Sequence, residues 1–319
     1  MIHLVTGGAG FVAANLIPQL LARGLHVVAL DNLRLGRREF VQEFLAHPGF
    51  EFMEIDCADE EAVRSAFDAA SRKGKITDVW HLAANSDISA GVVDPEVDFK
   101  NTFLTSFVVV KVMAAFGTKN LHFASSSAIY GDHKDKKIDE LTFPMPISNY
   151  GAMKLASEAQ MLAAAETFLE RLNIFRFPNV TGAPASHGVI FDFVNKLKSS
   201  PDVLKVLGNG TQQKAYLHVA DLVSAMLFIF DRAKEKRNIH NIGPDDDGVT
   251  VKFIAETVRD IVSPTARIEY GAGDRGWVGD VPKFRYDCGR LSALGWRPSL
   301  SSSDAVRRSA SEISAQILK

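Results

Sequence analysis

The chain has 319 residues, and its 36 lysines and arginines nearly balance its 38 aspartates and glutamates, so the formal net charge is −2. Hydrophobic residues make up 46% and charged residues 23%, which excludes a disordered chain, a collagen-like chain and a disulfide scaffold. The small net charge gives no electrostatic reason to expect nucleic acid as a partner. At this length we expect one large domain or two closely packed ones.

Two cysteines, Cys57 and Cys288, are too few for a zinc-ligand cluster and do not indicate a disulfide framework. The first residues, MIHLVTGGAG, lack the basic leader, apolar run and small-residue site of a secretory signal. Gly, Pro or charged residues interrupt every long apolar run, so we expect no membrane-spanning segment. These features predict a cytoplasmic protein without a metal site.

Six short apolar runs, all within the first 180 residues, are rich in Val, Ile and Leu and predict buried parallel strands. Longer segments with a helical period lie between them. Because strand and helix alternate, the sequence predicts the α/β class with a Rossmann-type, doubly wound parallel sheet. The predicted strands are 2–5, 26–30, 51–55, 78–82, 121–124 and 173–177, and the predicted helices are 11–23, 37–46, 60–72, 96–116 and 150–172.

The alternation becomes less regular after Pro178. A helix is predicted at 189–199, followed by one more helix and strand of the sheet at 215–233 and 239–242. Short helices at 251–261 and 303–318 and a strand at 266–270 are predicted near the end. We therefore expect a sheet domain of residues 1–177 plus about 215–243, and a smaller C-terminal substrate-binding domain of about 178–214 and 244–319.

A glycine-rich turn, Thr6-Gly-Gly-Ala-Gly-Phe-Val12, joins the first predicted strand to the first helix. Gly7 and Gly10 permit a tight turn and the close approach of a pyrophosphate to the helix N-terminus. Asp31 ends the second strand, where an acid accepts hydrogen bonds from the adenosine ribose, and its charge favours NAD over NADP. Three nearby arginines, Arg34, Arg37 and Arg38, leave NADP as the alternative. The sheet domain is thus predicted to bind a dinucleotide.

Asp56 and Cys57 end the third strand, where a side chain can meet the adenine. An equally open alternative is that Asp56 caps the next helix.

Tyr150 and Lys154 stand four residues apart near the start of a long predicted helix and therefore share one face. A Tyr is a poor base at its ordinary pKa near ~10, but an adjacent ammonium and a cationic nicotinamide favour its phenolate. Serines at 125–127 end a parallel strand, where ligands bind. Each pattern alone also fits an amphipathic helix or a turn cap. Together with the glycine turn they indicate proton and hydride transfer at a sugar hydroxyl.

The chain resembles the extended short-chain dehydrogenase/reductase family, in its nucleotide-sugar epimerase branch. The resemblance rests on VTGGAGFV, DNL, HLAA, KNTFLTS, SSSAIYG, YGAMK, RFPNVTG, GNGTQQKAYLHVADL, NIG and LGW, in this order over nearly the whole chain. It implies that Ser126 and Tyr150 are catalytic, that Lys154 binds the nicotinamide ribose and lowers the Tyr pKa, and that Asn101 supports the active-site helix. The cofactor contacts that it implies are Gly7, Gly10, Phe11, Val12, Asp31, Asn32, Asp56, Cys57, Leu82, Ala83, Ala84, Asn101, Tyr150, Lys154 and Phe177.

The residues after Ser126 narrow the chemistry that the resemblance implies. Ser127 and Ala128 replace the Asp-Glu pair of sugar 4,6-dehydratases and the Glu of decarboxylases, and the Cys of fucose-type epimerase-reductases is missing. The remaining set implies an NAD-dependent 4-epimerase that oxidises the sugar to a transient 4-keto form and returns the hydride to the opposite face. The alternatives are a nucleotide-sugar reductase or dehydrogenase, an epimerase at C2 or C6 (including heptose substrates), and a non-catalytic binding protein.

The resemblance places the substrate diphosphate near Asn179, the backbone of Val189 and Lys214. Lys214 replaces the usual Arg and lacks its bidentate fork. A second usual Arg is replaced by Trp277, for which Arg275 could substitute. The residues expected to face the sugar are Asn85, Ser86, Ser126 and Ser127, while Asp87 either recognises hydroxyls or caps the next segment.

Two further expectations concern histidines and assembly. His187 and His218 are single histidines without a carboxylate nearby in the sequence, so a structural role is expected. Helices 96–116 and 150–172 have large apolar faces, and relatives pair such helices across a two-fold axis. This implies a homodimer through a four-helix bundle, with burial inside one chain as the alternative.

Overall fold

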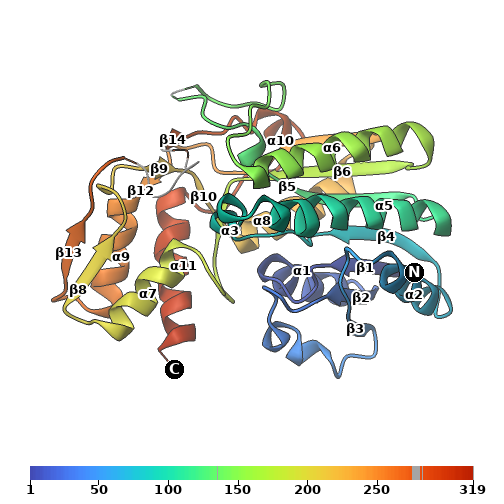
Figure 1. Ribbon diagram of the computed structural model, residues 1–319, viewed down its shortest axis with the longest axis horizontal. Coiled ribbons are helices and arrows are strands. Elements are labelled where there is room, and N and C mark those ends of the chain that lie inside the picture. The colour runs from blue at the N-terminus through green and yellow to red at the C-terminus, as the bar shows by residue number, and fades with distance from the viewer. Residues whose placement is uncertain (135, 275–280, 282, 319) are drawn as a thin grey trace. The chain divides into compact units, whose positions relative to one another are not determined.

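The computed structural model describes residues 1–134, 136–274, 281 and 283–318 (Figure 1). The chain divides into two compact units. The first unit comprises Met1–Ile129, Pro146–Arg176 and Ile229–His240, and the second comprises Tyr130–Met145, Phe177–Phe228 and Asn241–Lys319. Each unit is described separately below.

The central element is a seven-stranded sheet with the order β11-β6-β5-β4-β1-β2-β3. β1 pairs in parallel with β2 and β4, with Leu4 opposite Val28 and Val79. Strands β1 to β6 lie in the order β3-β2-β1-β4-β5-β6, which is that of a Rossmann sheet and confirms the predicted fold class. The strands are β1 (Ile2–Thr6), β2 (His26–Asp31), β3 (Phe50–Glu54), β4 (Ile76–His81), β5 (Asn120–Ser126), β6 (Arg171–Phe177) and β11 (Arg237–Asn241).

Helices cover both faces of this sheet. Leu4 of β1 lies in one core cluster with Phe67, Val109 and Met161 from three helices. Neighbouring strand residues point to opposite faces, so Trp80 of β4 faces the other side, where the ring of Phe230 packs 5.4 Å from it. The helices that contribute are α1 (Phe11–Ala22), α2 (Glu60–Ser71), α5 (Thr105–Phe116), α6 (Asn149–Thr167) and α8 (Val219–Arg232).

Three predicted helices differ from the structure. The predicted helix 37–46 is wrong: two 3-10 turns, Arg38–Phe40 and Gln42–Phe44, replace it, and the Arg37 amide donates to the carbonyl of Ala9 at 2.9 Å. That bond ties the segment to the glycine turn, and Val41, with φ −113° and ψ −4°, separates the two turns, whose amides bond to carbonyls three residues back. The predicted 96–116 consists of α4 (Pro95–Asp98), a π-helical segment (Phe99–Leu104) and α5. The predicted 150–172 ends early, at Thr167, because β6 begins at Arg171.

By length and composition, the stretch Pro95–Phe116 could cross a membrane, contrary to our expectation for the sequence. Its side chains Val109, Val112 and Met113 are fully buried in the core of the first unit. A core helix next to a parallel sheet is apolar for the same reason that a membrane helix is.

The second unit has its own core, in which Phe193, Ile254 and Val306 pack together. The predicted helices 251–261 and 303–318 and strand 266–270 are confirmed as α9, α11 and β13, whereas the predicted helix 215–233 begins only at Val219 and follows a short strand. The elements are β7 (Asn179–Thr181), α7 (Val189–Ser199), β8 (Val203–Val206), β9 (Gln213–Lys214), β10 (Tyr216–His218), β12 (Val249–Thr250), α9 (Val251–Val262), β13 (Arg267–Tyr270), β14 (Lys283–Phe284), α10 (Gly289–Ala293) and α11 (Ser302–Ile317).

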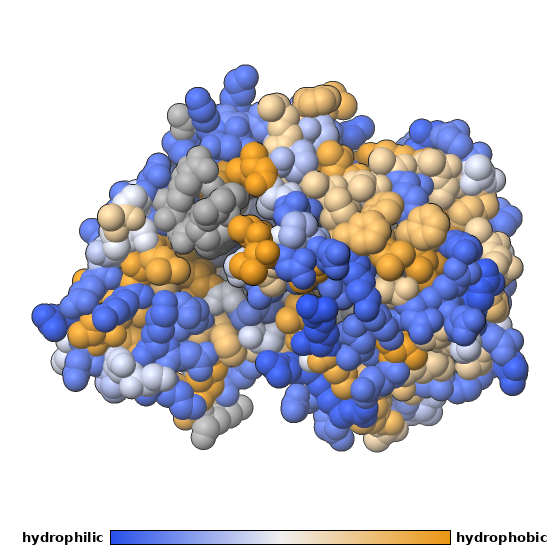
Figure 2. Space-filling view, in the orientation of Figure 1, coloured by the Kyte–Doolittle hydropathy of each residue, from blue (hydrophilic) through white to orange (hydrophobic). Residues whose placement is uncertain are grey.

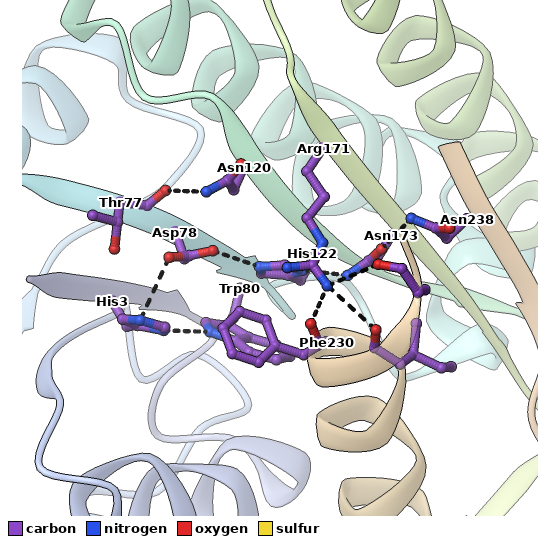
Figure 3. A network of polar contacts seen from close by, with 12 residues as sticks. His3, Thr77, Asp78, Trp80, Asn120, His122, Arg171, Asn173, Phe230 and Asn238 are labelled. Atoms are coloured by element: carbon purple, nitrogen blue, oxygen red, sulfur yellow. Dashed lines mark hydrogen bonds and ion pairs between the residues drawn. The ribbon is translucent and has the colours of Figure 1, made fainter. Parts of the chain in front are cut away.

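A buried polar network crosses the sheet near the start of its strands (Figure 3). Asp78 accepts a hydrogen bond from His122 Nε2 at 3.0 Å and lies 3.5 Å from His3 Nε2. The other ring nitrogens also have donors: Trp80 Nε1 is 3.1 Å from His3 Nδ1, and Asn173 Nδ2 is 2.9 Å from His122 Nδ1. Both histidines are therefore neutral with the proton on Nε2.

Candidate active site

The glycine turn is shaped by close backbone approach. Gly7 has φ +67°, and a Cβ there would come within 2.8 Å of Ala83 N. Gly10 is the N-cap of α1 and provides no side-chain acceptor for the first amides of the helix. Those amides are suited to an anion such as a pyrophosphate. Phe11 and Val12, which were predicted to contact the cofactor, form the first turn of this helix.

Asp31 is the last residue of β2 and is anchored beside this turn. Its Oδ2 accepts from Ala9 N at 3.0 Å and its Oδ1 accepts from Leu33 N at 2.8 Å. Burial raises the pKa of Asp31, and these two hydrogen bonds oppose that rise. Each carboxylate oxygen keeps acceptor capacity for a ribose hydroxyl.

Two of the three arginines near Asp31 have partners within the first unit. Arg38 pairs with Glu54 at 2.7 Å, and Arg34 Nη1 donates to Asn101 Oδ1 at 3.4 Å. The neighbouring Asn32 accepts from the Arg34 amide at 3.0 Å. Two of the arginines that left NADP as the alternative thus have partners within the protein.

The structure tests whether Asp56, which follows β3, caps the next helix. Asp56 Oδ1 accepts from Ala58 N at 2.9 Å, whereas the N-cap of α2 is Asp59. The suggestion that Asp56 caps the helix is therefore wrong. Cys57 is buried, and burial raises the pKa of its thiol.

The residues after β4 run alongside the glycine turn. Leu82 N donates to Thr6 O at 3.2 Å, and Ala83 N donates to Thr6 Oγ1 at 3.3 Å. Leu82, Ala83 and Ala84 thus lie beside the turn predicted to hold the cofactor. Asn101 lies in the π-helical segment, where its Nδ2 donates to Val97 O at 2.8 Å.

The structure brings Ser126, Tyr150 and Lys154 together at the end of β5. Ser126 hydrogen-bonds Tyr150, and Lys154 Nζ donates to Ala124 O at 2.5 Å. The start of α6 comes so close to β5 that a Cβ at Gly151 would lie 2.3 Å from Ala128 O. A glycine between Tyr150 and Lys154 therefore allows the contact that positions both side chains.

The electrostatics of these groups are unusual. Burial raises the pKa of Tyr150 to about 12, the hydrogen bond from Ser126 opposes the rise, and the charge of Asp98 adds to it. Burial lowers the pKa of Lys154 to about 7, and the charge of Glu158 opposes the fall. A cationic nicotinamide beside Tyr150 would favour its phenolate.

Hydrogen bonds of Asn85 and Asp87 hold the loop that follows the HLAA motif. Asn85 is buried, and its Nδ2 donates to Asp87 O at 2.7 Å and to Asp98 Oδ1 at 2.8 Å. Asp87 caps α3 (Ile88–Val93) by accepting from Ala90 N at 3.1 Å, which is the capping role considered for it. Ser86 is exposed and Ser127 is half-buried, so both hydroxyls remain predicted sugar contacts.

Three buried charged residues near the site, Asp98, Glu158 and Arg176, were missed by our reading of the sequence. Glu158 follows Lys154 by four residues, so the helical spacing that identified Tyr150 and Lys154 could also have identified it. Nothing in the local pattern indicates that Asp98 is buried.

The remaining predicted substrate contacts in the second unit lie on separate elements. Asn179 begins β7, and Val189 begins α7 after Gly188, whose φ is +103°. Lys214 ends β9 and pairs with Val249 and Phe284. Phe177 ends β6. Arg275 and Trp277 lie outside the described residues.

Both histidines singled out in the sequence have polar neighbours. His218 Nε2 pairs with Glu312 at 3.0 Å, and His187 Nδ1 lies 3.0 Å from Ser186 Oγ. Among the residues that the structure describes, no group of three or more His, Cys, Asp or Glu side chains could hold a metal.

Residues 3–243 match the model of the NAD dependent epimerase/dehydratase family. A UDP-glucose 4-epimerase of Streptomyces lividans is 30% identical over 314 residues, covering 93% of this chain and 91% of that protein. The crystal structure of a UDP-galactose 4-epimerase matches with a TM-score of 0.86 and 33% identity, covering 99% of this chain and 100% of that one. The Thermus thermophilus UDP-glucose 4-epimerase in complex with NAD matches with a TM-score of 0.84 and 29% identity, covering 98% and 99%. The chain therefore belongs to the NAD dependent epimerase/dehydratase family, as its motifs implied.

Proposed function

We propose that this protein is an NAD-dependent nucleotide-sugar 4-epimerase, an isomerase whose substrates are UDP-sugars. Family membership supports the cofactor and the enzyme class, and the relatives above are UDP-glucose and UDP-galactose 4-epimerases. The observation that carries the proposal is the cluster of Ser126, Tyr150 and Lys154 at the end of β5. This minimal set can move a proton at a sugar hydroxyl and lacks an additional acid for eliminating water.

The residues present fit NAD. The first amides of α1 have no side-chain cap at Gly10, which suits a pyrophosphate. The Asp31 carboxylate beside the turn suits a ribose diol and opposes a 2′-phosphate. We propose the remaining cofactor contacts as predicted from the sequence.

In the proposed mechanism, Tyr150 removes the proton from the sugar 4-hydroxyl while Ser126 hydrogen-bonds the same oxygen. Bound between the glycine turn and Tyr150, NAD would supply the redox chemistry, a reversible hydride transfer at C4 of the sugar. Lys154 holds a positive charge near the Tyr150 ring, 5.9 Å from its centroid, and so stabilises the phenolate. Tyr150 finally returns the proton to the sugar oxygen, and no cofactor is consumed.

We propose that the second unit binds the nucleotide diphosphate through Asn179, Val189 and Lys214. Lys214 offers a point charge instead of a bidentate fork, so we expect a weaker hold on the diphosphate than an Arg would give. Lys214→Arg therefore tests this part of the proposal by a lower KM for the UDP-sugar.

Proton NMR in D2O with a panel of UDP-, GDP-, CDP- and ADP-sugars tests the function. We expect one UDP-sugar to form its 4-epimer with catalytic NAD, without accumulation of NADH and without deuterium on carbon. A stoichiometric change in NADH would instead indicate a dehydrogenase or reductase. Deuterium on carbon would indicate proton loss beside a ketone and contradict direct 4-epimerisation.

We also propose a homodimer in which α5 and α6 of two copies form a four-helix bundle. Apolar side chains gather over α5 and α6 in Figure 2. Phe99, Phe103 and Phe107 follow at four-residue spacing with ring centroids 6.1 and 6.4 Å apart, and Phe99 and Phe107 are exposed. An exposed aromatic stripe of this kind is typical of an interface.

Light scattering tests the dimer. We expect the wild type at twice the chain mass and Phe107→Glu as a monomer. Phe143→Glu, an exposed aromatic outside α5 and α6, is the matched control and should remain dimeric. A monomeric wild type, or an unaltered Phe107→Glu dimer, would contradict the proposal.

We propose the cytoplasm as the location of the enzyme. Cys57 and Cys288 are both buried free thiols, which suits a reducing compartment. Cell fractionation with an antibody against the chain would test this.

A further inference from the structure

Glu158 lies on the same face of α6 as the predicted catalytic residues. Tyr150, Lys154 and Glu158 follow each other at intervals of four residues, so they line one side of the helix. Lys154 and Glu158 are both buried, at 2% exposure each, although such residues are rarely buried without a partner. A third ionisable residue in this line, with no place in the mechanism above, calls for a physical explanation.

The carboxylate of Glu158 is held from two strands. Arg176 of β6 donates from Nε to Oε1 at 3.0 Å and from Nη2 to Oε2 at 2.7 Å. Ser125 of β5 donates its hydroxyl to Oε1. A bidentate pair of this kind fixes both the position and the ionisation of a buried carboxylate. The geometry therefore holds the Glu158 carboxylate against Arg176.

The charges around Lys154 leave Glu158 as its counter-ion. Lys154 Nζ lies 4.7 Å from the Phe123 ring centroid and bonds the uncharged Ala124 carbonyl. His81 of β4 is neutral, because burial and, to a smaller extent, the charge of Lys154 lower its pKa to about 3. Within the described chain, the titratable and charged groups of this cluster are Tyr150, Lys154 and Glu158 on α6, His81 on β4, Arg176 on β6 and Asp98 on α4.

We propose that Glu158 is a positioning residue that keeps the buried Lys154 charged, while Arg176 keeps Glu158 from binding the ammonium directly. Lys154 then retains its proton for Tyr150 and for the nicotinamide ribose. The catalytic consequence rests on the proposed function, whereas the effect of Glu158 on the charge of Lys154 does not. In this arrangement Glu158 stabilises the ammonium of Lys154, and Lys154 itself acts on Tyr150 and the nicotinamide ribose.

The proposal makes predictions of opposite sign. Glu158→Gln removes the anion and leaves Arg176 nearby, so Lys154 should lose its proton at lower pH, by about one pH unit or more. Arg176→Gln removes a cation and frees Glu158 to attract the ammonium, so Lys154 should lose its proton at higher pH. Ser125→Ala removes one hydrogen bond but no charge, and is the matched control with an almost unchanged midpoint.

The titration of Lys154 is measured by NMR of the full-length protein labelled with [ε-13C]lysine, with its signal assigned by comparison with Lys154→Met. This readout needs neither substrate nor turnover. Opposite shifts in Glu158→Gln and Arg176→Gln support the proposal, and if one variant does not fold, the sign of the other decides. Unchanged midpoints, or the same shift in all three variants, would overturn it and leave Glu158 a structural residue.

A second readout uses activity. The alkaline limb of the kcat profile should move to lower pH in Glu158→Gln, with KM little changed, and Glu158→Asp should restore it in part. If the Lys154 midpoint moves as expected but no UDP-sugar turns over, the proposed function fails and the charge-holding role of Glu158 stands. If turnover is present and its pH profile is the same in Glu158→Gln, Glu158 does not act through Lys154.

Discussion

The first unit contains two buried polar clusters, which lie at opposite ends of the strands of one parallel sheet. The network of His3, Asp78, His122 and Asn173 lies near the start of the strands, and each side chain in it has its protons assigned to specific partners (Figure 3). The cluster of Tyr150, Lys154 and their neighbours lies at the carboxyl ends of the strands. Burial there raises the pKa of Tyr150 and lowers the pKa of Lys154. The first arrangement fixes protons in place, and the second leaves them able to move.

The two clusters differ in how far the charge of their central group, Asp78 or Lys154, is compensated by its neighbours. Around Asp78, His122 donates a hydrogen bond to the carboxylate and His3 lies 3.5 Å from it, and these interactions hold the pKa of Asp78 at about 2 despite burial. Around Lys154, one carboxylate is shared with Arg176, so the ammonium is only partly compensated. We expect changes in the first cluster to affect stability and changes in the second to affect chemistry. The following predictions test this separation.

Tyr150→Phe should have the largest effect. Removing the phenol leaves no group to move the proton, so kcat should fall by about 10² to 10⁴-fold. NAD should still bind, since the ring and Lys154 remain. Kinetics and isothermal titration calorimetry with NAD check the two parts, and retained turnover would contradict the assigned base.

Asp78→Ala should lower the free energy of unfolding by about 3 kcal/mol, because the buried N–H group of His122 loses its acceptor and His3 loses its neighbouring carboxylate. Urea unfolding measures this change. Asn120→Ala, which removes a single part-buried bond to Thr77 O of 3.0 Å, is the control and should cost about 1 kcal/mol. Both variants should keep the wild-type kcat, and a large loss of kcat in Asp78→Ala would erase the distinction between the clusters.

Acid should destabilise the protein through the first cluster. Burial lowers the pKa of His3 to about 4, so the unfolded chain takes up a proton at higher pH than the folded one. Stability is therefore lost as the pH falls from about 6.5 toward 4, by about 3 kcal/mol for this group. Thermal unfolding between pH 4 and 7 checks the slope. His3→Gln should show a shallower slope, and an equal slope would contradict the contribution of His3.

Asp31→Ala should have the smallest effect of the four. Losing the predicted ribose acceptor should weaken NAD about tenfold, or about 1.4 kcal/mol, and relax the preference against NADP. Dissociation constants for both cofactors provide the measurement. If neither changes, Asp31 acts only through its bonds to Ala9 and Leu33.

Much of the fold was predictable because local patterns determine it. Apolar runs placed the strands, and the glycine turn and the Tyr150–Lys154 spacing located the candidate site without long-range information. The prediction of a helix at 37–46 failed because the backbone forms two separate 3-10 turns, which the apolar pattern did not distinguish from an α-helix.

The partners of buried charges were not predictable for a related reason. Asp78 meets His122 from 44 residues away, and His218 meets Glu312 from 94 residues away. Strand order brings the first pair together, and the packing of α11 against β10 brings the second together, so no spacing along the chain reveals either. Glu158 was within reach of the helical pattern, but its role depends on Arg176 in a neighbouring strand.

Retention of isotope at C4 tests the central claim most directly. A UDP-sugar carrying deuterium at C4 is equilibrated with the NAD-loaded enzyme in ordinary water, and both epimers are examined by NMR. The account predicts that both epimers retain the deuterium at C4, because the hydride leaves and returns without exchange. Loss of the label to solvent, or its recovery in free NADH, would contradict a redox-neutral 4-epimerase.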